Sequence, residues 1–256
     1  MTSIISSDIH QSLVAPGQPI RRRLNMGASQ LEYFSNSPMA ITIDPSWIHL
    51  GDPPNFQAFS EKGTFISFLK ILARRGLRWI RPEVGRRPAL YESTNFEPWV
   101  FNDGDKLRFE DNSFSFVYSE HFLEHLRFDV AIQLLLELKR VLAVGGVVRI
   151  VVPDADYRTY EPQEPLGFPS VKLPFHHPNK HKVRWNVYML KSAMECAGRR
   201  AIPLVYCDEN GNFEDRDPKH AYSNLQPIVD PEFVYSLAYI ARRRSLVVDG
   251  LKARSG

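Results

Sequence analysis

Residues 114–154 read "FSFVYSEHFLEHLRFDVAIQLLLELKRVLAVGGVVRIVVPD", and this stretch decides the fold class. Its two ends, residues 114–119 and 147–154, are short apolar runs that predict strands buried on both faces. Residues 128–142 between them carry apolar side chains at helical spacing. A strand, a helix and a strand in this order predict a right-handed parallel crossover.

The helix predicted over residues 128–142 has signals at both ends. Asp129 is the expected N-cap, and Lys139 and Arg140 lie near the C-terminus, where cations are favourable. Gly145 and Gly146 are expected to end the helix. Its apolar stripe consists of Ala131, Leu135, Leu138 and Leu142.

The same alternation extends outward in both directions and predicts an α/β fold with a doubly wound, mostly parallel sheet. Before the central stretch, "RRLNMG" and "MAITIDPS" are expected to be the first two strands. After it come a helix in "NVYMLKSAMECAG", closed by Gly198, and strands in "AIPLVYC" and "RRRSLVVDGLK".

The remaining segments predict one domain with an insertion. Residues 1–19 are rich in Ser, Pro and Gln and are expected to be a loose lead-in to a single domain over residues 20–256. The turn-rich stretch "DPSWIHLGDPPN" and the helical pattern that follows break the alternation. We therefore predict an insertion at about residues 50–98.

Composition excludes several classes of protein. The formal charge is +3 and the pI about 8.8, so nothing indicates the dense basic face of a nucleic-acid binder. Only Cys196 and Cys207 are present, which indicates packing residues in a reducing, cytoplasmic environment. The N-terminus lacks the pattern of a signal peptide, and no apolar run reaches about 18 residues. The expected protein is soluble or peripheral at a membrane.

Two longer segments resemble a known family. Residues 107–126, "LRFEDNSFSFVYSEHFLEHL", and residues 135–157, "LLELKRVLAVGGVVRIVVPDADY", resemble the class I S-adenosylmethionine-dependent methyltransferases. More narrowly, they are similar to the small bacterial predicted methyltransferases of the methyltransferase-11 type, often linked to surface-polysaccharide genes. The resemblance implies a Rossmann-like, seven-stranded sheet with an antiparallel last strand, and S-adenosylmethionine as the cofactor.

The expected cofactor site lies beyond the carboxyl ends of the central strands, where strand order reverses. Gly27 would let the backbone approach the methionine part of the cofactor, because it has no Cβ. Ala28 and Ser29 are also small, although Ser29 stands where such turns usually have a second glycine. Asn25 and Glu120 are further cofactor-binding candidates.

Two aspartates are candidates for the remaining cofactor contacts. Asp44 is expected to accept hydrogen bonds from the ribose hydroxyls, with a turn before Pro45 as the alternative. Asp103 occupies the family's adenine-binding acidic position, as the resemblance implies. Asp105 could exchange roles with Asp103, and a solvated turn is the alternative for both.

The segment "SEHFLEHL" supplies the catalytic candidates His121 and His125, because histidine is the natural general base near neutral pH. We favour His121 as the base, since the family's Leu-Glu-His is usually structural and makes His125 a supporting residue. Their i, i+4 spacing also suggests a metal, but the glutamate arrangement of a zincin is absent, so no metal is expected.

A second histidine group, His176, His177 and His181, belongs to a loop expected to overhang the same crevice. We interpret this loop as a substrate lid, with a three-imidazole metal site as the alternative. Residues 64–81 interleave apolar and basic side chains, which indicates either a lid helix packed on the domain or an interfacial helix on anionic lipid.

The sequence favours a methyltransferase acting on a small-molecule or glycan acceptor, which could be carried on a lipid. An inactive methyltransferase-like binding or scaffold module is the alternative, because the glycine loop is altered and "AVGG" replaces Lys-Pro-Gly-Gly. A dehydrogenase is a weaker alternative, since "GASQLE" has only the first glycine of Gly-x-Gly-x-x-Gly. No feature of the sequence indicates an oligomeric state.

Overall fold

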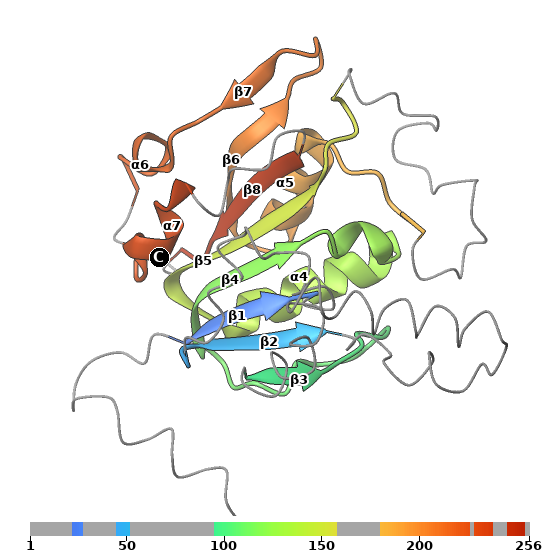
Figure 1. Ribbon diagram of the computed structural model, residues 1–256, viewed down its shortest axis with the longest axis vertical. Coiled ribbons are helices and arrows are strands. Elements are labelled where there is room, and N and C mark those ends of the chain that lie inside the picture. Colours follow the sequence, from blue (N-terminus) through green and yellow to red (C-terminus); the bar gives the residue numbers. More distant parts are fainter. Residues whose placement is uncertain are drawn as a thin grey trace, which may run out of the picture.

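The computed structural model describes residues 22–27, 45–51, 95–157, 180–225, 228–237 and 245–253. Their strands form one sheet in the order β3-β2-β1-β4-β5-β8-β6-β7 (Figure 1). The strands are β1 Arg23–Met26, β2 Trp47–Gly51, β3 Phe96–Pro98, β4 Phe114–Glu120, β5 Leu142–Pro153, β6 Arg200–Cys207, β7 Phe213–Asp215 and β8 Ser245–Leu251.

Strands β1 to β5 are parallel, and their order reverses at one place. From β1 the chain proceeds to β2 and β3 on one side, whereas β4 pairs with the other side of β1 and β5 follows it. β8 lies between β5 and β6 and is antiparallel to both. This confirms the predicted α/β sheet with an antiparallel last strand, and the short strand β7 adds an eighth member to the expected seven.

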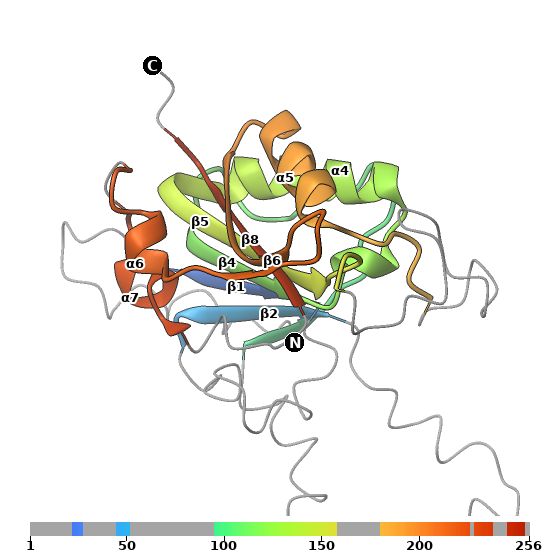
Figure 2. The same cartoon turned by 90° about the horizontal axis from the view of Figure 1, so that it is seen from above.

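The two faces of the sheet are covered differently (Figure 2). Helices α4 (Phe128–Val141) and α5 (Val187–Cys196) cover one face with apolar side chains. The other face carries two short helices, α6 (Pro218–Ala221) and α7 (Pro231–Val234). Tyr222, which directly follows α6, and Val234 of α7 belong to an apolar cluster on that face. All four residues of the predicted apolar stripe over residues 128–142 are fully buried.

Buried ion pairs occupy the face under α6 and α7. Arg149 of β5 and Asp249 of β8 are paired at 2.7 Å with both side chains fully buried, and the Tyr222 hydroxyl donates to the same carboxylate at 2.6 Å. Burial, and next the Asp249 carboxylate, raise the pKa of Tyr222, which keeps this hydroxyl a donor. At the amino ends of β1 and β4, Arg23 and Ser115 both donate to Asp230 at 2.8 Å.

The second strand of the sheet differs from the sequence prediction. β2 runs over Trp47–Gly51, inside the stretch that we interpreted as a turn-rich connection. Of the predicted strand, residues 39–44 lie outside the described residues, and Pro45 and Ser46 form a turn. The apolar run "WIHL" is short and lies among Pro and Gly residues, which hid it among turn signals. Phe96–Pro98 is also a strand, which pairs with β2 although it falls within the predicted insertion at about residues 50–98. The greater part of that predicted insertion, residues 52–94, lies outside the described residues.

Both ends of α4 also correct the prediction. Arg127 occupies the N-cap position without a side-chain cap, and Asp129 lies in the first turn, where it pairs with Arg127 at 2.5 Å. The helix passes directly into β5 at Leu142, so Gly145 and Gly146 belong to the strand. A Cβ on Gly146 would lie 2.9 Å from the backbone oxygens of Ala143 and Ser115, so close strand contact requires the glycine.

The elements after the crossover follow the prediction more closely. Asn186 caps α5 by accepting a hydrogen bond from the Met189 N–H at 2.9 Å, and Gly198 follows the helix with a φ of +73°. Cys207 is buried as expected, but Cys196 is exposed and is not a packing residue.

The predicted lead-in over residues 1–19 and the predicted helix over residues 64–81 lie outside the described residues. None of the helices in the described part of the chain combines the length and the apolar run needed to cross a bilayer.

Candidate cofactor and active site

Gly27 lies where strand order reverses, at the carboxyl end of β1. Its N–H donates to the Leu50 carbonyl of β2 at 2.9 Å, and its φ is +78°, a value that favours glycine. A Cβ at this position would lie 2.6 Å from the Cβ of Phe122, which follows β4. The small residue therefore lets the ends of β1 and β4 approach closely, beside the point where α/β sheets bind ligands.

The turn after β4 has an unusual backbone. His121 has a φ of +50°, which is uncommon for a residue with a side chain, and its N–H donates to the Val151 carbonyl of β5 at 2.9 Å. The turn continues into a 3-10 helix over Leu123–His125. Such strain persists where the surrounding structure enforces it and is common at functional sites.

The 3-10 helix places Glu124 and His125 against the segment that begins at Lys180. The Glu124 carbonyl accepts hydrogen bonds from the N–H groups of Lys182 at 2.7 Å and Val183 at 3.2 Å. His125 Nδ1 lies 3.2 Å from the Lys180 carbonyl, and because a carbonyl only accepts, this nitrogen is the donor. Two segments far apart in the sequence are thus joined by hydrogen bonds.

His181 completes a cluster at this edge of the sheet. Its ring packs edge-on against the His125 ring, with centroids 4.9 Å apart. One potential ligand atom from each of Glu124, His125 and His181 lies within 4.8 Å of the other two. His121 Nδ1 lies 3.2 Å from Glu124 Oε1, so three histidines surround one buried carboxylate.

The loop with the adenine candidates is fixed to α4 and to itself. The Gly104 N–H donates to the Gln133 side chain at 2.9 Å, and Asp105 accepts from the Asn102 N–H at 2.7 Å. Asp105 is therefore engaged in a turn, as its alternative interpretation predicted. Asp103 is exposed, and no described residue bonds to its carboxylate. This geometry is compatible with an adenine contact by Asp103, which stays a prediction.

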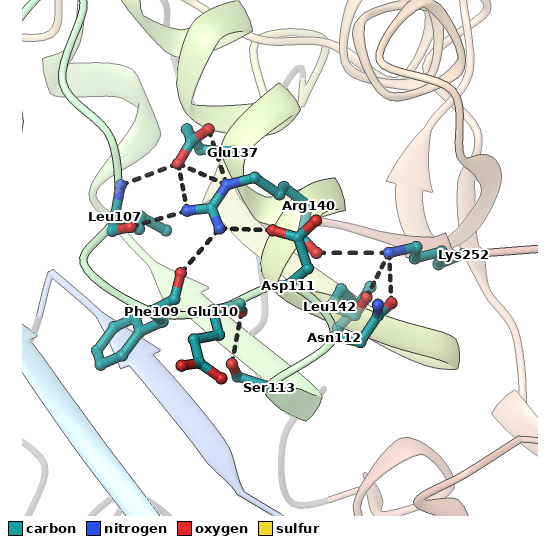
Figure 3. A network of polar contacts seen from close by, with 10 residues as sticks. All are labelled: Leu107, Phe109, Glu110, Asp111, Asn112, Ser113, Glu137, Arg140, Leu142 and Lys252. Carbon is teal, nitrogen blue, oxygen red and sulfur yellow. Dashed lines mark hydrogen bonds and ion pairs between the residues drawn. The ribbon is translucent and has the colours of Figure 1, made fainter.

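Arg140 holds the continuation of this loop (Figure 3). Its guanidinium donates to the carbonyls of Leu107 and Phe109, each at 2.8 Å, and also to Glu137 and Asp111. The hydrogen bond from Arg140 is the main reason that the pKa of Glu137 is lowered. The motif arginine that the family resemblance rests on thus orders the loop between the adenine candidates and β4.

Two of the cofactor candidates have buried partners. Asn25 is 5% exposed, and its side-chain amide lies 3.1 Å from His49 Nδ1 on the neighbouring strand. Glu120 is the last residue of β4, and its carboxylate accepts from the Tyr118 hydroxyl at 3.0 Å. Both side chains are buried, so their cofactor contacts also stay predictions.

The other predicted site residues lie outside the described residues: Ala28, Ser29, Asp44, His176 and His177. Asp44 was expected to follow the second strand, but β2 begins after it, at Trp47. Pro45 and Ser46 precede β2, and the Ser46 carbonyl accepts from the Arg23 N–H at the amino end of β1, at the opposite edge from Gly27. The strand next to β1 ends at Gly51, and the sequence continues with Asp52, an acidic residue that we did not consider.

The sequence did not indicate that Glu124 and His181 meet. The repeated spacing of His121, Glu124 and His125 was a usable signal, because residues three or four apart lie on one side of a helical turn. A surface hollow lined by Lys219, Pro231, Glu232, Tyr235 and Ser236 lies at α7, whose preceding residue Asp230 contacts the amino ends of β1 and β4. The hollow is therefore remote from the cluster of His121, His125 and His181, which lies beyond the carboxyl end of β4.

A family model described as "Methyltransferase domain" matches residues 71–150, which is 80 of the 256 residues. The matched segment covers the loop from Asn102 to Asp111, strand β4, the histidine turn and α4, and it does not reach Gly27. Class I methyltransferases with this domain use S-adenosylmethionine. No curated protein matches the sequence.

Several solved structures are similar to this chain. One chain of the complex that contains the Haloferax volcanii Trm112 methyltransferase activator is 16% identical, with 93% of this chain and 85% of that chain covered and a TM-score of 0.48. A SAM dependent methyltransferase from Archaeoglobus fulgidus is 13% identical, with 91% of this chain and 86% of that chain covered and a TM-score of 0.44. An O-methyltransferase family protein from Burkholderia thailandensis is 12% identical, with 92% of this chain and 52% of that chain covered and a TM-score of 0.45.

Proposed function

We propose, from the premise that residues 71–150 belong to the methyltransferase-domain family, that this chain methylates an oxygen or nitrogen of a small-molecule or glycan acceptor. One observation carries the proposal. Gly27 and the turn after β4 touch at the point where strand order reverses, which is where sheets of this kind bind ligands. The acceptor class is supported by the family resemblance alone.

The residues at this edge fit S-adenosylmethionine. Gly27 and Asp103 would contact it, the first through bare backbone and the second through an exposed carboxylate. Ala28, Ser29 and Glu120 are adjacent candidates in the sequence or at the same edge. The cofactor supplies a methyl group already activated on a sulfonium, so the protein mainly has to position the acceptor.

His121 is the proposed base for a hydroxyl acceptor, because it is partly exposed at the same edge and hydrogen-bonded to Glu124.

We place the protein in a reducing compartment, since both cysteines are free. Contact with a membrane surface through residues 64–81 is a further proposal, which would suit a lipid-linked saccharide.

Calorimetric titration of the purified chain with S-adenosylmethionine and S-adenosylhomocysteine tests the function. We expect both to bind at a single site. If neither binds at high micromolar concentration, the chain is a methyltransferase-like scaffold instead.

A matched pair of variants locates the ribose contact. Either Asp44→Ala or Asp52→Ala should weaken binding by about 1 to 3 kcal/mol, because the buried ribose hydroxyls lose a charged acceptor. The end of β2 at Gly51 favours Asp52 over Asp44. Unchanged affinity in a variant removes that aspartate from the site.

A further inference from the structure

We propose that Glu124, His125 and His181 bind one divalent metal ion of the kind that prefers nitrogen ligands, with Zn²⁺ as the best match. Ligand atoms held at about 2 Å from one ion lie at most about 4 Å apart. The donor atoms of these residues are all within 4.8 Å of one another, so small side-chain rotations bring them to a common ion.

The carboxylate of Glu124 is the strongest argument for an ion. Its side chain is only 2% exposed, and Oε2 is buried without a hydrogen-bond partner among the described residues. A buried, ionised carboxylate oxygen is costly unless a charge or a donor compensates it. The nearest nitrogen of His125, Nε2, lies 3.9 Å from Oε1, which is beyond hydrogen-bond distance, so this contact leaves Oε2 uncompensated.

The tautomer of His125 suits a metal ligand. Because Nδ1–H donates to the Lys180 carbonyl, Nε2 is the ring nitrogen that can offer a lone pair to an ion, and it is the nitrogen nearest Glu124. Histidines that bind metals almost always donate their other N–H to a carbonyl or a carboxylate. His121 supports the site differently, by donating Nδ1–H to Glu124 Oε1 at 3.2 Å, and so orients the carboxylate.

The site does not depend on an ion to bring its parts together. Glu124 and His125 lie in one turn, and backbone hydrogen bonds from Lys182 and Val183 to the Glu124 carbonyl fix the segment that carries His181. The ligands are thus preorganised on two segments that are far apart in the sequence.

The ligand set selects the kind of ion. Two imidazoles and one carboxylate form a zinc site that keeps a fourth position for water or substrate. Magnesium and calcium prefer oxygen ligands and are disfavoured here. An ion in this position polarises an oxygen bound to it, so it would hold an acceptor hydroxyl beside the carboxyl end of β4. This last consequence rests on the proposed function.

The test titrates Zn²⁺ into the full chain after chelator treatment, by calorimetry with a competing chelator. We expect one ion per chain. His181→Ala and His125→Ala should each weaken binding by at least about 100-fold, because even residues that only orient a ligand contribute about 10- to 100-fold. His220→Ala, which changes an exposed histidine of α6, is the matched control and should bind as the unaltered chain does.

Three outcomes would overturn the proposal. The first is no binding at about 100 μM Zn²⁺, a concentration far above the dissociation constant expected of a zinc site. The others are zinc binding that His181→Ala leaves unchanged, and zinc binding that is lost only in a His176→Ala/His177→Ala double variant. Because Glu124 is buried, Glu124→Gln serves as a further ligand variant only after its circular dichroism matches the unaltered chain. Titration of the same preparations with S-adenosylhomocysteine separates the two proposals. Cofactor binding without zinc binding contradicts the metal site alone, and the reverse contradicts the proposed function alone.

Discussion

Buried carboxylates on two sides of the molecule are treated differently. Asp249, under α6 and α7, receives hydrogen bonds on both oxygens, from Arg149 Nε at 2.8 Å on one and from Arg149 Nη2 and Tyr222 on the other. Glu124, beyond the carboxyl end of β4, is almost as buried, but no described residue donates to its Oε2. A carboxylate with both oxygens paired is explained by the fold, whereas one left half paired points to a ligand.

Replacing Asp249 should have the largest effect. Asp249→Asn leaves the fully buried Arg149 without its anion and should lower the free energy of unfolding by about 3 to 5 kcal/mol. Urea denaturation followed by circular dichroism measures it. Asp129→Ala, which removes an exposed pair with Arg127, is the control and should cost less than about 1 kcal/mol. Equal losses in the two variants would mean that the buried pair is not structural.

Gly27→Ala tests the contact between β1 and the turn after β4. The added methyl group would meet Phe122 in a backbone conformation that alanine tolerates poorly, so we expect a loss of about 1 to 3 kcal/mol in unfolding free energy. Gly104→Ala is a matched control, because its φ of +81° is similar and no atom lies within 4 Å of the added Cβ. The same loss in both variants would assign the whole effect to backbone strain.

Glu124→Gln makes the same chemical change as Asp249→Asn at the other carboxylate. In metal-free buffer it should leave the unfolding free energy unchanged or raise it by up to about 1 kcal/mol, because it removes a buried carboxylate of which one oxygen, Oε2, has no donor among the described residues. His121 can still donate to the amide oxygen. Denaturation of the two variants side by side is the measurement. A loss of about 2 kcal/mol or more for Glu124→Gln, typical of a broken buried hydrogen bond to a charge, would place this carboxylate in the same structural class as Asp249.

The smallest effect concerns the loop that Arg140 holds. The pKa of Glu137 is lowered in the folded protein, chiefly by Arg140, so the pair stabilises the fold above the ordinary value of 4.5 and loses this contribution as the pH falls below it. Glu137→Gln should therefore lose less stability between about pH 5 and pH 3 than the unaltered chain, by under about 1 kcal/mol because the pair is partly exposed. The measurement is the free energy of unfolding of both proteins as a function of pH, and equal pH dependence in the two would contradict this prediction.

The accuracy of the sequence predictions follows the distance over which each signal acts. The crossover from β4 through α4 to β5 is predictable because its apolar periods are local and uninterrupted. β2 is missed because its short apolar run lies between Pro45 and the "GDPP" turn signal and carries too little periodicity, while its place is set by pairing with β1. This shift of one strand also moved the expected acidic position from Asp44 toward Asp52.

The sequence by itself determined the fold class and the histidine-rich turn after β4, since each is encoded in continuous stretches, whereas the antiparallel last strand was expected only from the family resemblance. Only the tertiary structure decided that Gly27 touches Phe122, that Arg149 meets Asp249, and that His181 joins Glu124 and His125. These contacts depend on which strands become neighbours. That choice is made by burial of the whole sheet between its two apolar layers, which no local pattern of residues records.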